Sequence, residues 1–575
     1  MQRKTSRDVE NAAVSLAALL SLVLLFVGQV EIGVIAWGTA FAGSFVPTVS
    51  RYRRRVFGKV LGMQPTNRIL MLVAIGVLLA DSATPNVWLA WIALVMTVFV
   101  TRSEGALRKL GTFARPRASG FELARIPSRF RKLSTAYGVF QCVSLLGFLV
   151  LALSEAPGGL WLIPSSACCL TYILIGADLI SARRVSRLVN ATLPDRVMAL
   201  RPAFMVYWDA PKNSQYQLAM WIPHLRGLGL PFFVLVRNSE SFEQAVSVCG
   251  GVPVVHGRTM ADLERYCVPS LRAVFYMNNA ARNSHCVRYS HLEHVQLLHG
   301  DSDKAPSFNP VTRMFDKIFV AGQAGIDRYS SHGIDISRDR FEIVGRPQVS
   351  GIIRPLGGTS ETSGETLLYA PTWRGYHDDA SYSSLASARG IIAAALQRGY
   401  HVIFRPHPYA YKDEEFTRII RSVHQMLRED QQASGRQHFF GSPAEKQMSI
   451  TECFNRSDLM VTDISSVVVD YLYSEKPLIL VRRGSAESFV HEFPVAEAAY
   501  VVDGSVEELE AAFADIETGD PLATVRSEKR AYYLGDFSDD GYEGVFRAAA
   551  RRAVLGRQEM NTASATAQMD YAAGV

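Results

Sequence analysis

The stretch TDISSVVVDYLYSEKPLILV, residues 462–481, decides the fold of the C-terminal part of the chain. It follows a short apolar run, residues 459–461, which predicts a buried strand, and its last four residues form a second such run. Between them lie a polar turn with Asp463, Ser465 and Ser466 and then an apolar segment of helical length. This order of strand, turn, helix and strand is typical of a parallel α/β sheet.

The turn places small hydroxyl side chains at the start of the predicted helix. The first amides of a helix have no partner inside it, and together with the helix dipole they favour a phosphate group at that end. Ser465 and Ser466 would let a phosphate approach and could add hydrogen bonds. Asp463 or Ser465 could instead only cap the helix. On this segment alone, a phosphate site and a plain helix cap are equally good interpretations.

The 575-residue chain changes character near residue 200. Before that point long apolar runs alternate with short basic clusters, whereas the rest resembles an ordinary soluble α/β protein. The runs are close to the length that crosses a hydrocarbon core of about 30 Å, so they predict about six transmembrane helices. Because the third run is short, four or five spans remain alternatives. The runs cover residues 12–30, 32–49, 68–80, 87–100, 136–153 and 160–180.

Basic residues are found only at those ends of the runs that would lie on one side of the membrane. They precede the first run, follow the second, fill the segment after the fourth and follow the sixth, whereas the turns around Glu31, Asp81 and Glu155 contain neither Lys nor Arg. This pattern predicts a multi-pass protein of the cytoplasmic membrane with both ends in the cytoplasm. The net charge of +6 mostly reflects these clusters, so it is poor evidence for nucleic-acid binding. The seven cysteines show no CxxC spacing and support neither a zinc site nor a disulfide framework.

Beyond residue 200 the pattern of strands and helical segments occurs twice. We therefore predict an α-helical transmembrane bundle followed by an α/β fold of two Rossmann-like domains, with a ligand cleft between them. The predicted strands are residues 204–208, 232–236, 252–255, 273–277, 366–369, 401–404, 459–461 and 478–481, and predicted helices cover 383–398 and 445–455. The expected domains are residues 1–200 in the membrane, 201–350 and 351–556, followed by a disordered tail at 557–575.

Two polar segments that follow apolar runs contain histidines. The first, HGDSDK at residues 299–304, provides His299 beside a glycine that permits close approach of a ligand. Its D-S-D triplet is interpreted as a loop rather than a metal site. The second, FRPHPYAY, holds Arg405 and His407 between prolines that fix the backbone. A lone histidine is more often structural, but polar neighbours at a strand end favour a functional interpretation for both.

Another segment, YAPTWRG at residues 369–375, offers the hydroxyl of Thr372 and the guanidinium of Arg374. A surface salt bridge would explain Arg374 equally well. With the histidine segments and the Ser465–Ser466 turn, however, it places cations and hydroxyls around one cleft. Together these groups suit a diphosphate ligand.

The succession LLHGDSDK, YAPTWRG, FRPHPYAY and TDISSVVVDYL resembles, in order, the motifs of the CDP-glycerol glycerophosphotransferase family of teichoic acid primases and polymerases, over about residues 205–547. The late FSDDGYEGVFR, residues 537–547, resembles the C-terminal D-G…R signature of that family. The resemblance implies a GT-B fold that takes a CDP-alditol donor and a lipid-linked or polymeric acceptor at a membrane, without nucleic acid, cofactor or metal.

The resemblance also implies roles for single residues. His299 matches the general base of the family and His407 its second essential histidine, beside the diphosphate. The remaining substrate-binding positions are Gly300, Lys304, Thr372, Arg374, Arg405, Asp463, Ser465, Ser466 and Asp470. Two alternatives stay open: a GT-B glycosyltransferase that uses a CMP- or UDP-sugar, and a non-catalytic membrane scaffold that retains the fold.

Overall fold

The computed structural model describes most of the chain as two compact units. The first unit contains Met1–Arg117 and Glu122–Asp195, and the second contains Ala118–Phe121 and Arg196–Val575. The expected disordered tail, 557–575, lies outside the described residues. The described residues are 2–52, 65–113, 115–126, 129–300, 302–303, 305–354, 365–375, 382–482, 485–538 and 541–556.

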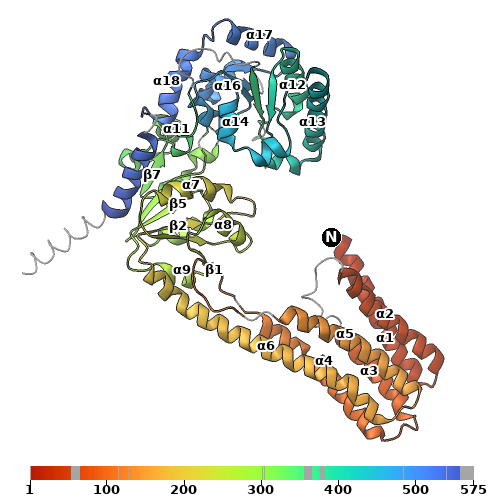
Figure 1. Ribbon diagram of the computed structural model, residues 1–575. Coiled ribbons are helices and arrows are strands. Elements are labelled where there is room, and N and C mark those ends of the chain that lie inside the picture. Colours follow the sequence, from red (N-terminus) through yellow and green to blue (C-terminus); the bar gives the residue numbers. More distant parts are fainter. Residues whose placement is uncertain are drawn as a thin grey trace, which may run out of the picture. The chain divides into compact units, whose positions relative to one another are not determined.

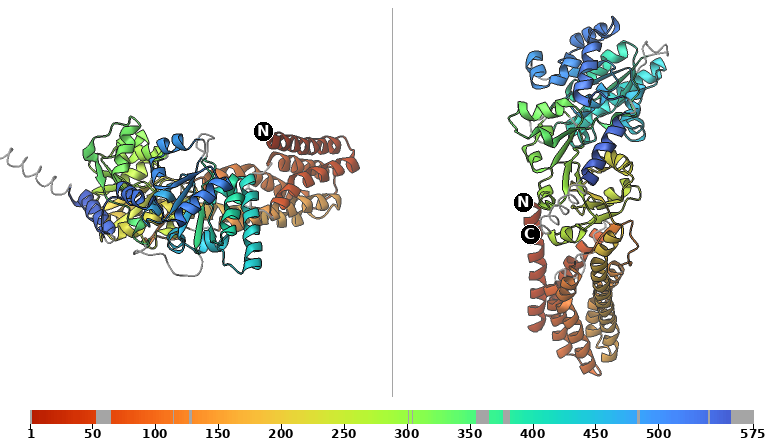
Figure 2. Two further views of the ribbon diagram at one scale, coloured as in Figure 1. Left: turned by 90° about the horizontal axis from the view of Figure 1, so that it is seen from above. Right: turned by 90° about the vertical axis from the view of Figure 1, so that its left-hand side faces the viewer.

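The first unit consists of helices that lie side by side (Figure 2). Three apolar segments are long enough to cross a membrane: Val87–Gly111, Lys132–Leu153 and Gly158–Ala199. The apolar parts of the other three helices are shorter, so the described residues support three of the predicted spans by length and composition. The helices are α1 (Gln2–Phe26), α2 (Val30–Tyr52), α3 (Pro65–Ala80), α4 (Val87–Gly111), α5 (Phe130–Leu153) and α6 (Gly158–Ala199).

An arginine at the start of the short third run is buried inside this bundle. The Nη1 and Nη2 atoms of Arg68 each donate to the carboxylate of Glu104 at 2.6 Å. The hydroxyl of Tyr137 donates to the same carboxylate at 2.7 Å. A buried charge without a partner is costly in apolar surroundings, so this network explains how α3 accommodates the arginine.

The second unit begins with an eight-stranded sheet of order β1-β4-β3-β2-β5-β6-β7-β8. Only the edge strand β1 is antiparallel; from β2 onward this is the Rossmann order, in which the strand sequence reverses between β2 and β5. The strands are β1 (Ala118–Ser119), β2 (Phe204–Trp208), β3 (Phe232–Val236), β4 (Val254–His256), β5 (Ala273–Tyr276), β6 (Glu293–Gln296), β7 (Lys317–Val320) and β8 (Phe341–Ile343). Its helices are α7 (Tyr216–Arg226), α8 (Phe242–Val248), α9 (Met260–Tyr266), α10 (Ser284–Val287) and α11 (Gln323–Ser331).

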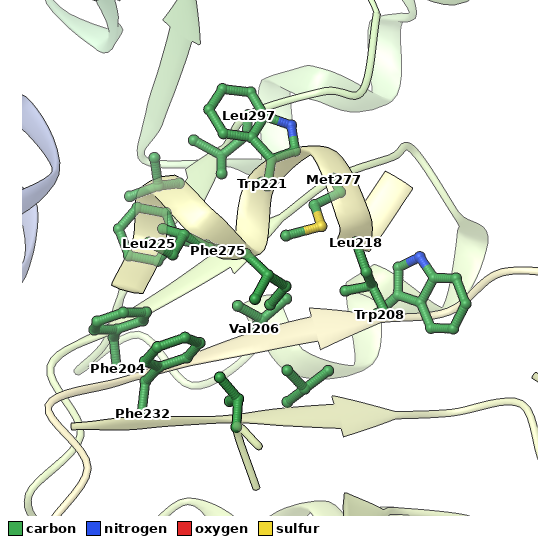
Figure 3. Close-up of a cluster of buried hydrophobic side chains, with 14 of the residues drawn as sticks. Phe204, Val206, Trp208, Leu218, Trp221, Leu225, Phe232, Phe275, Met277 and Leu297 are labelled. Carbon is green, nitrogen blue, oxygen red and sulfur yellow. The ribbon is translucent and has the colours of Figure 1, made fainter. Parts of the chain in front are cut away.

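Helix α7 covers one face of this sheet (Figure 3). Its apolar residues Leu218, Trp221 and Leu225 are buried against side chains of β2, β3 and β5. The rings of Phe204 and Phe232 stack with centroids 4.6 Å apart. The continuous apolar runs predicted strands here because both faces of a parallel sheet are covered.

The second sheet has five parallel strands in the order β10-β9-β11-β12-β13. Helices α12 and α13 lie on one side of it (Figure 1), whereas α14, α15 and α16 belong to the core on the other side. The two sheets confirm the expected pair of Rossmann-like halves. The strands are β9 (Thr366–Ala370), β10 (His401–Phe404), β11 (Leu459–Thr462), β12 (Leu478–Val481) and β13 (Tyr500–Val502). The helices are α12 (Ala388–Gln397), α13 (Glu414–Ser434), α14 (Ile450–Arg456), α15 (Ser466–Leu472), α16 (Ala486–Glu492), α17 (Val506–Glu517) and α18 (Ala523–Leu534).

Several features differ from the sequence-based expectation; the helix predicted at residues 383–398, for example, is α12 at Ala388–Gln397. The helix predicted at residues 445–455 starts later, at Ile450, because a π turn (Pro443–Gln447) ends before α14 begins with a capping box between Ser449 and Glu452. In addition, the final helical stretch, 541–556, returns to the first half. Its residues Phe546, Ala549, Ala550 and Val554 join the core around α7.

Candidate functional site

The predicted ligand-binding segments leave the second sheet where its strand order reverses. Strand β9 lies between β10 and β11, and Ala370 at the end of β9 pairs with Thr462 at the end of β11. The segments YAPTWRG and TDISS therefore start side by side at the same edge. In open α/β sheets ligands bind at this reversal, beyond the carboxyl ends of the strands.

Asp463, at the corner after β11, is fully buried and accepts several hydrogen bonds. The backbone N–H of Thr372 donates to both carboxylate oxygens, at 3.0 and 3.1 Å. The N–H and the hydroxyl of Ser384 donate to Oδ2 at 2.7 and 2.8 Å. Asp463 thus holds the segment after β9 in place, which is a framework role beside its predicted substrate-binding role.

The two serines of the corner follow directly. Ser465 has extended backbone (φ −162°) and its side chain makes no capping hydrogen bond to α15. Its Oγ is buried and has no hydrogen-bond partner within the described part of the chain. The plain cap interpretation for Ser465 is therefore not supported. Helix α15 has only seven residues, so its dipole adds less than the sequence argument assumed.

His299 follows a strained turn at the end of β6. Leu298 adopts φ +54°, a region that bulky residues seldom enter. The Trp221 indole N–H donates to the Leu298 carbonyl at 2.6 Å, and the Gln296 side chain accepts from the Leu298 N–H at 3.2 Å. Contacts on both sides of Leu298 therefore fix the backbone that carries the imidazole.

The hydrogen bond of the imidazole defines its tautomer. His299 Nδ1 lies 2.8 Å from the carbonyl oxygen of Met277, and a carbonyl only accepts, so Nδ1 carries the proton. In the neutral ring the lone pair is therefore on Nε2. Burial lowers the pKa of His299 below its ordinary value, and the positive charge of Arg346 lowers it further. The ring is thus a neutral base at physiological pH.

Two contacts connect the His299 loop and the interdomain segment with α15. A methyl group on Gly300 would lie 3.1 Å from Ser466 Cβ, so the histidine loop and the serine corner meet. Arg346 pairs with Asp470 of α15 through Nε to Oδ1 and through Nη2 to Oδ2 at 3.1 Å. Asp470, a predicted substrate-binding residue, thus holds the two halves together.

His407 and Arg405 leave β10 beside the end of β9. The backbone N–H of Tyr409 donates to His407 Nδ1 at 3.1 Å, so in the neutral ring the proton is on Nε2. His407 thus presents an N–H donor, the opposite of His299. Arg405 Nη1 donates to the carbonyls of Ala444 and of Met448, the latter at 2.8 Å, and so fixes the turn before α14.

Of the remaining predicted residues, Thr372 is buried at the corner, whereas Arg374 is partly exposed. The guanidinium of Arg374 pairs with Asp413 at 3.2 Å and with Glu415 at 2.7 Å, which supports the surface salt-bridge interpretation. Lys304 lies outside the described residues, as do Asp301 and Asp540.

Asp303, the second aspartate of the D-S-D triplet, is buried. Its Oδ1 accepts from Arg328 Nε and Nη2 at 3.1 and 3.0 Å. Its Oδ2 accepts from the hydroxyl of Tyr533 at 2.8 Å and from the N–H of Val495 at 3.2 Å. The side chain therefore fastens the histidine loop to the second half, in agreement with the loop interpretation of the triplet.

Three residues around His299 were missed by the sequence reasoning. Arg346 acts on the His299 pKa, Trp221 holds the preceding carbonyl, and the Tyr216 ring packs edge-on against the imidazole with centroids 5.8 Å apart. Arg346 had a usable signal, because it follows a glycine close to the boundary between the predicted domains 201–350 and 351–556. Trp221 and Tyr216 belong to an amphipathic helix and gave none.

Residues 346–483 match the family model described as CDP-Glycerol:Poly(glycerophosphate) glycerophosphotransferase. This range includes the segments YAPTWRG, FRPHPYAY and TDISS, whereas HGDSDK precedes it. The match confirms the resemblance found in the sequence, and with it a transferase of the CDP-glycerol glycerophosphotransferase type. No curated protein matches the chain.

Solved structures resemble the chain only distantly. A putative UDP-N-acetylglucosamine 2-epimerase from Listeria monocytogenes is 11% identical with a TM-score of 0.42, covering 61% of this chain and 95% of its own. The wall teichoic acid polymerase TagF is 12% identical with a TM-score of 0.40, covering 64% of this chain and 94% of its own. At these values the likeness carries no argument about activity.

Proposed function

We propose that the protein is a membrane-anchored transferase that moves a polyol phosphate, glycerol- or ribitol-phosphate, from a CDP-alditol to a hydroxyl of a lipid-linked or polymeric acceptor. CMP is released, and the product is a teichoic acid-like polymer of the cell envelope. The observation that carries the proposal is the meeting of Gly300 with Ser466, which brings a neutral histidine base to the serine corner. The family match over residues 346–483 supports the donor class.

His299 begins the proposed reaction. Its Nε2 takes the proton of an acceptor hydroxyl, whose oxygen attacks the β-phosphorus of the donor. A new P–O bond forms to the acceptor, the bond from the β-phosphorus to the bridging oxygen breaks, and CMP leaves with that oxygen. General base catalysis of this kind contributes typically 10²–10⁴-fold.

The second half would hold the diphosphate. His407 would donate through Nε2–H, and Ser465 through a buried hydroxyl that has no partner within the described residues. Thr372, Arg405 and the amides at Ser465 and Ser466 would add donors to the charge that develops on the leaving CMP. Arg374, which is engaged in surface ion pairs, would contribute least.

The helices of the first unit would keep the enzyme at its acceptor. The one-sided distribution of basic residues supports a multi-pass topology with the catalytic unit in the cytoplasm. Tethering raises the effective concentration of a lipid-linked acceptor at the cleft.

The full chain in detergent or membranes tests the proposal. We expect CMP release from CDP-glycerol or CDP-ribitol with acceptor, and a loss of about 10²–10⁴-fold in His299→Ala while donor binding persists. Consumption of a CMP- or UDP-sugar with both CDP-alditols left intact would establish a glycosyltransferase instead. Unchanged polymer synthesis by His299→Ala in an intact membrane complex would establish a scaffold.

A further inference from the structure

A cavity of about 610 Å³ lies beside Asp303, in the loop that carries His299. Its walls come from α11, from α16 and the Pro494 segment, and from α18. Ligand sites for small molecules commonly have volumes of about 300–1,000 Å³. The cavity is therefore large enough for a ligand of several rings.

The walls of this α11–α18 cavity combine polar and apolar side chains. Carboxylates that accept hydrogen bonds alternate with imidazole and hydroxyl groups that can donate or accept. Tyr532 and Pro494 add flat apolar surface between them. The polar side chains are Asp327, Ser331, His332, His491, Glu492 and Tyr532.

Two of these carboxylates are held in fixed positions. The hydroxyl of Tyr532 donates to Asp327 Oδ2 at 2.8 Å, and the hydroxyl of Tyr382 donates to Glu492 Oε1 at 3.1 Å. His332 stacks on Phe308 with ring centroids 3.7 Å apart. Positioned acceptors and rings with apolar faces suit the hydroxyl groups and C–H faces of a sugar.

The charge of the cavity argues against a polyanion. Arg328 lines the wall, but its guanidinium already donates twice to Asp303. Asp327 and Glu492 would repel a phosphate-rich chain, because like charges that lose water on binding are disfavoured. An uncharged ligand avoids this penalty.

Two lining residues connect the cavity with the proposed reaction site. Asp303 lines the cavity, and it belongs to the loop that carries His299 and Gly300. Arg328 lines this cavity and also a small cavity of about 30 Å³ beside Gly300 and Arg346. A ligand in the α11–α18 cavity therefore contacts the structural support of the catalytic loop.

We propose that the α11–α18 cavity binds an uncharged saccharide unit of the acceptor and so directs the acceptor hydroxyl toward His299. The identification of the saccharide as part of the acceptor rests on the proposed function. The existence of the saccharide site does not. The proposal assigns the specificity for the acceptor to residues of α11, α16 and α18, away from the diphosphate corner.

Saturation-transfer NMR on the detergent-solubilised full chain, without a donor, tests the site. The probes are two neutral trisaccharides, maltotriose and cellotriose, and a glycerol-phosphate trimer as the anionic arm. We expect at least one trisaccharide to bind, about tenfold more weakly in Glu492→Gln and in His332→Ala. Glu487→Gln, an exposed change on the same helix α16, and His291→Ala, an exposed histidine outside the cavity, should bind as the unchanged protein does.

Three results would overturn the inference: neither trisaccharide binds, the control variants weaken binding equally, or the glycerol-phosphate trimer binds through Glu492 and His332. CMP release from CDP-alditols is measured on the same samples. Release without saccharide binding would remove this inference alone, whereas saccharide binding without release would remove the proposed transferase reaction and leave the site.

Discussion

Gly300 faces Ser466 so closely that a methyl group added to the glycine would lie 3.1 Å from Ser466 Cβ and 3.4 Å from its Oγ. One residue follows His299, the proposed base, in the first half, and the other begins α15 in the second half. Real Cβ atoms seldom approach other atoms this closely. Glycine at position 300 therefore sets the distance between the proposed base and the proposed diphosphate site at the serine corner.

This contact predicts a coupling between the two positions. Gly300→Ala should lower transfer, because the loop or Ser466 must shift by a few tenths of an ångström. Ser466→Gly should also lower it, but in the double variant the two losses should not add. Contacting residues typically couple by about 0.5–3 kcal/mol in such a cycle, here derived from kcat/KM. Gly544→Ala, where a methyl group meets open space, is the control and should keep full activity. Strictly additive losses would contradict the contact.

Asp463 should contribute to the stability of the fold as well as to binding of the donor. The Asp463 carboxylate accepts hydrogen bonds from Thr372 and Ser384 through two oxygens. In Asp463→Asn one of these oxygens becomes an NH₂ group, which cannot accept. We expect a loss of about 1–3 kcal/mol in the free energy of unfolding, because buried donors lose their acceptor. Chemical denaturation measures it, and Asp515→Asn on the exposed face of α17 should change nothing. A variant that is as stable as the unchanged protein but binds the donor weakly would show that Asp463 acts in donor binding alone.

The elements that could be predicted are those in which nearly every side chain is buried. Phe204–Trp208, His401–Phe404 and Leu478–Val481 match β2, β10 and β12 to the residue, because apolar runs on a doubly covered sheet need no partner to be recognised. The two-residue strand β1 left no pattern, since pairing with β4 rather than its own composition makes it a strand.

The same distinction holds at the site. His299, His407 and the serine corner stand at strand ends, so local sequence indicated them. The partners of Asp303 and Asp470 could not be predicted, because Tyr533 and Arg346 approach them from distant parts of the chain. Arg374 shows the opposite case, in which a residue of the right type at a strand end pairs with surface carboxylates.

Asp303 should be needed for stability. Asp303→Asn removes the charge that neutralises buried Arg328, and breaking a buried ion pair costs about 3–5 kcal/mol. Tyr533→Phe removes one hydrogen bond to the same carboxylate and should cost about 0.5–1.5 kcal/mol. Denaturant unfolding of the full chain in detergent measures both, with the exposed Asp335→Asn as a control. Equal losses in the Asp303 and Tyr533 variants would show that the ion pair contributes little.

The pH dependence of transfer should report the environment of His299. Burial and the charge of Arg346 both lower the pKa of His299, so the base stays unprotonated to lower pH than an ordinary histidine. The acid limb of kcat/KM should therefore fall below the ordinary histidine value of about 6.5. Lowering the pH through this limb protonates Nε2 and removes the base.

The double variant Arg346→Gln/Asp470→Asn separates the two causes. It keeps a hydrogen-bonded pair between the halves but removes the charges of both residues. Because Arg346 lowers the His299 pKa, that pKa should rise and the acid limb should move to higher pH. The acid limb should still lie below the ordinary pKa of histidine, since burial lowers the His299 pKa more than Arg346 does. Arg374→Gln also removes an arginine but leaves Arg346 in place, and the limb should stay where it is. An acid limb that stays in place in the double variant, or that moves equally in Arg374→Gln, would contradict a direct effect of the Arg346 guanidinium on the base.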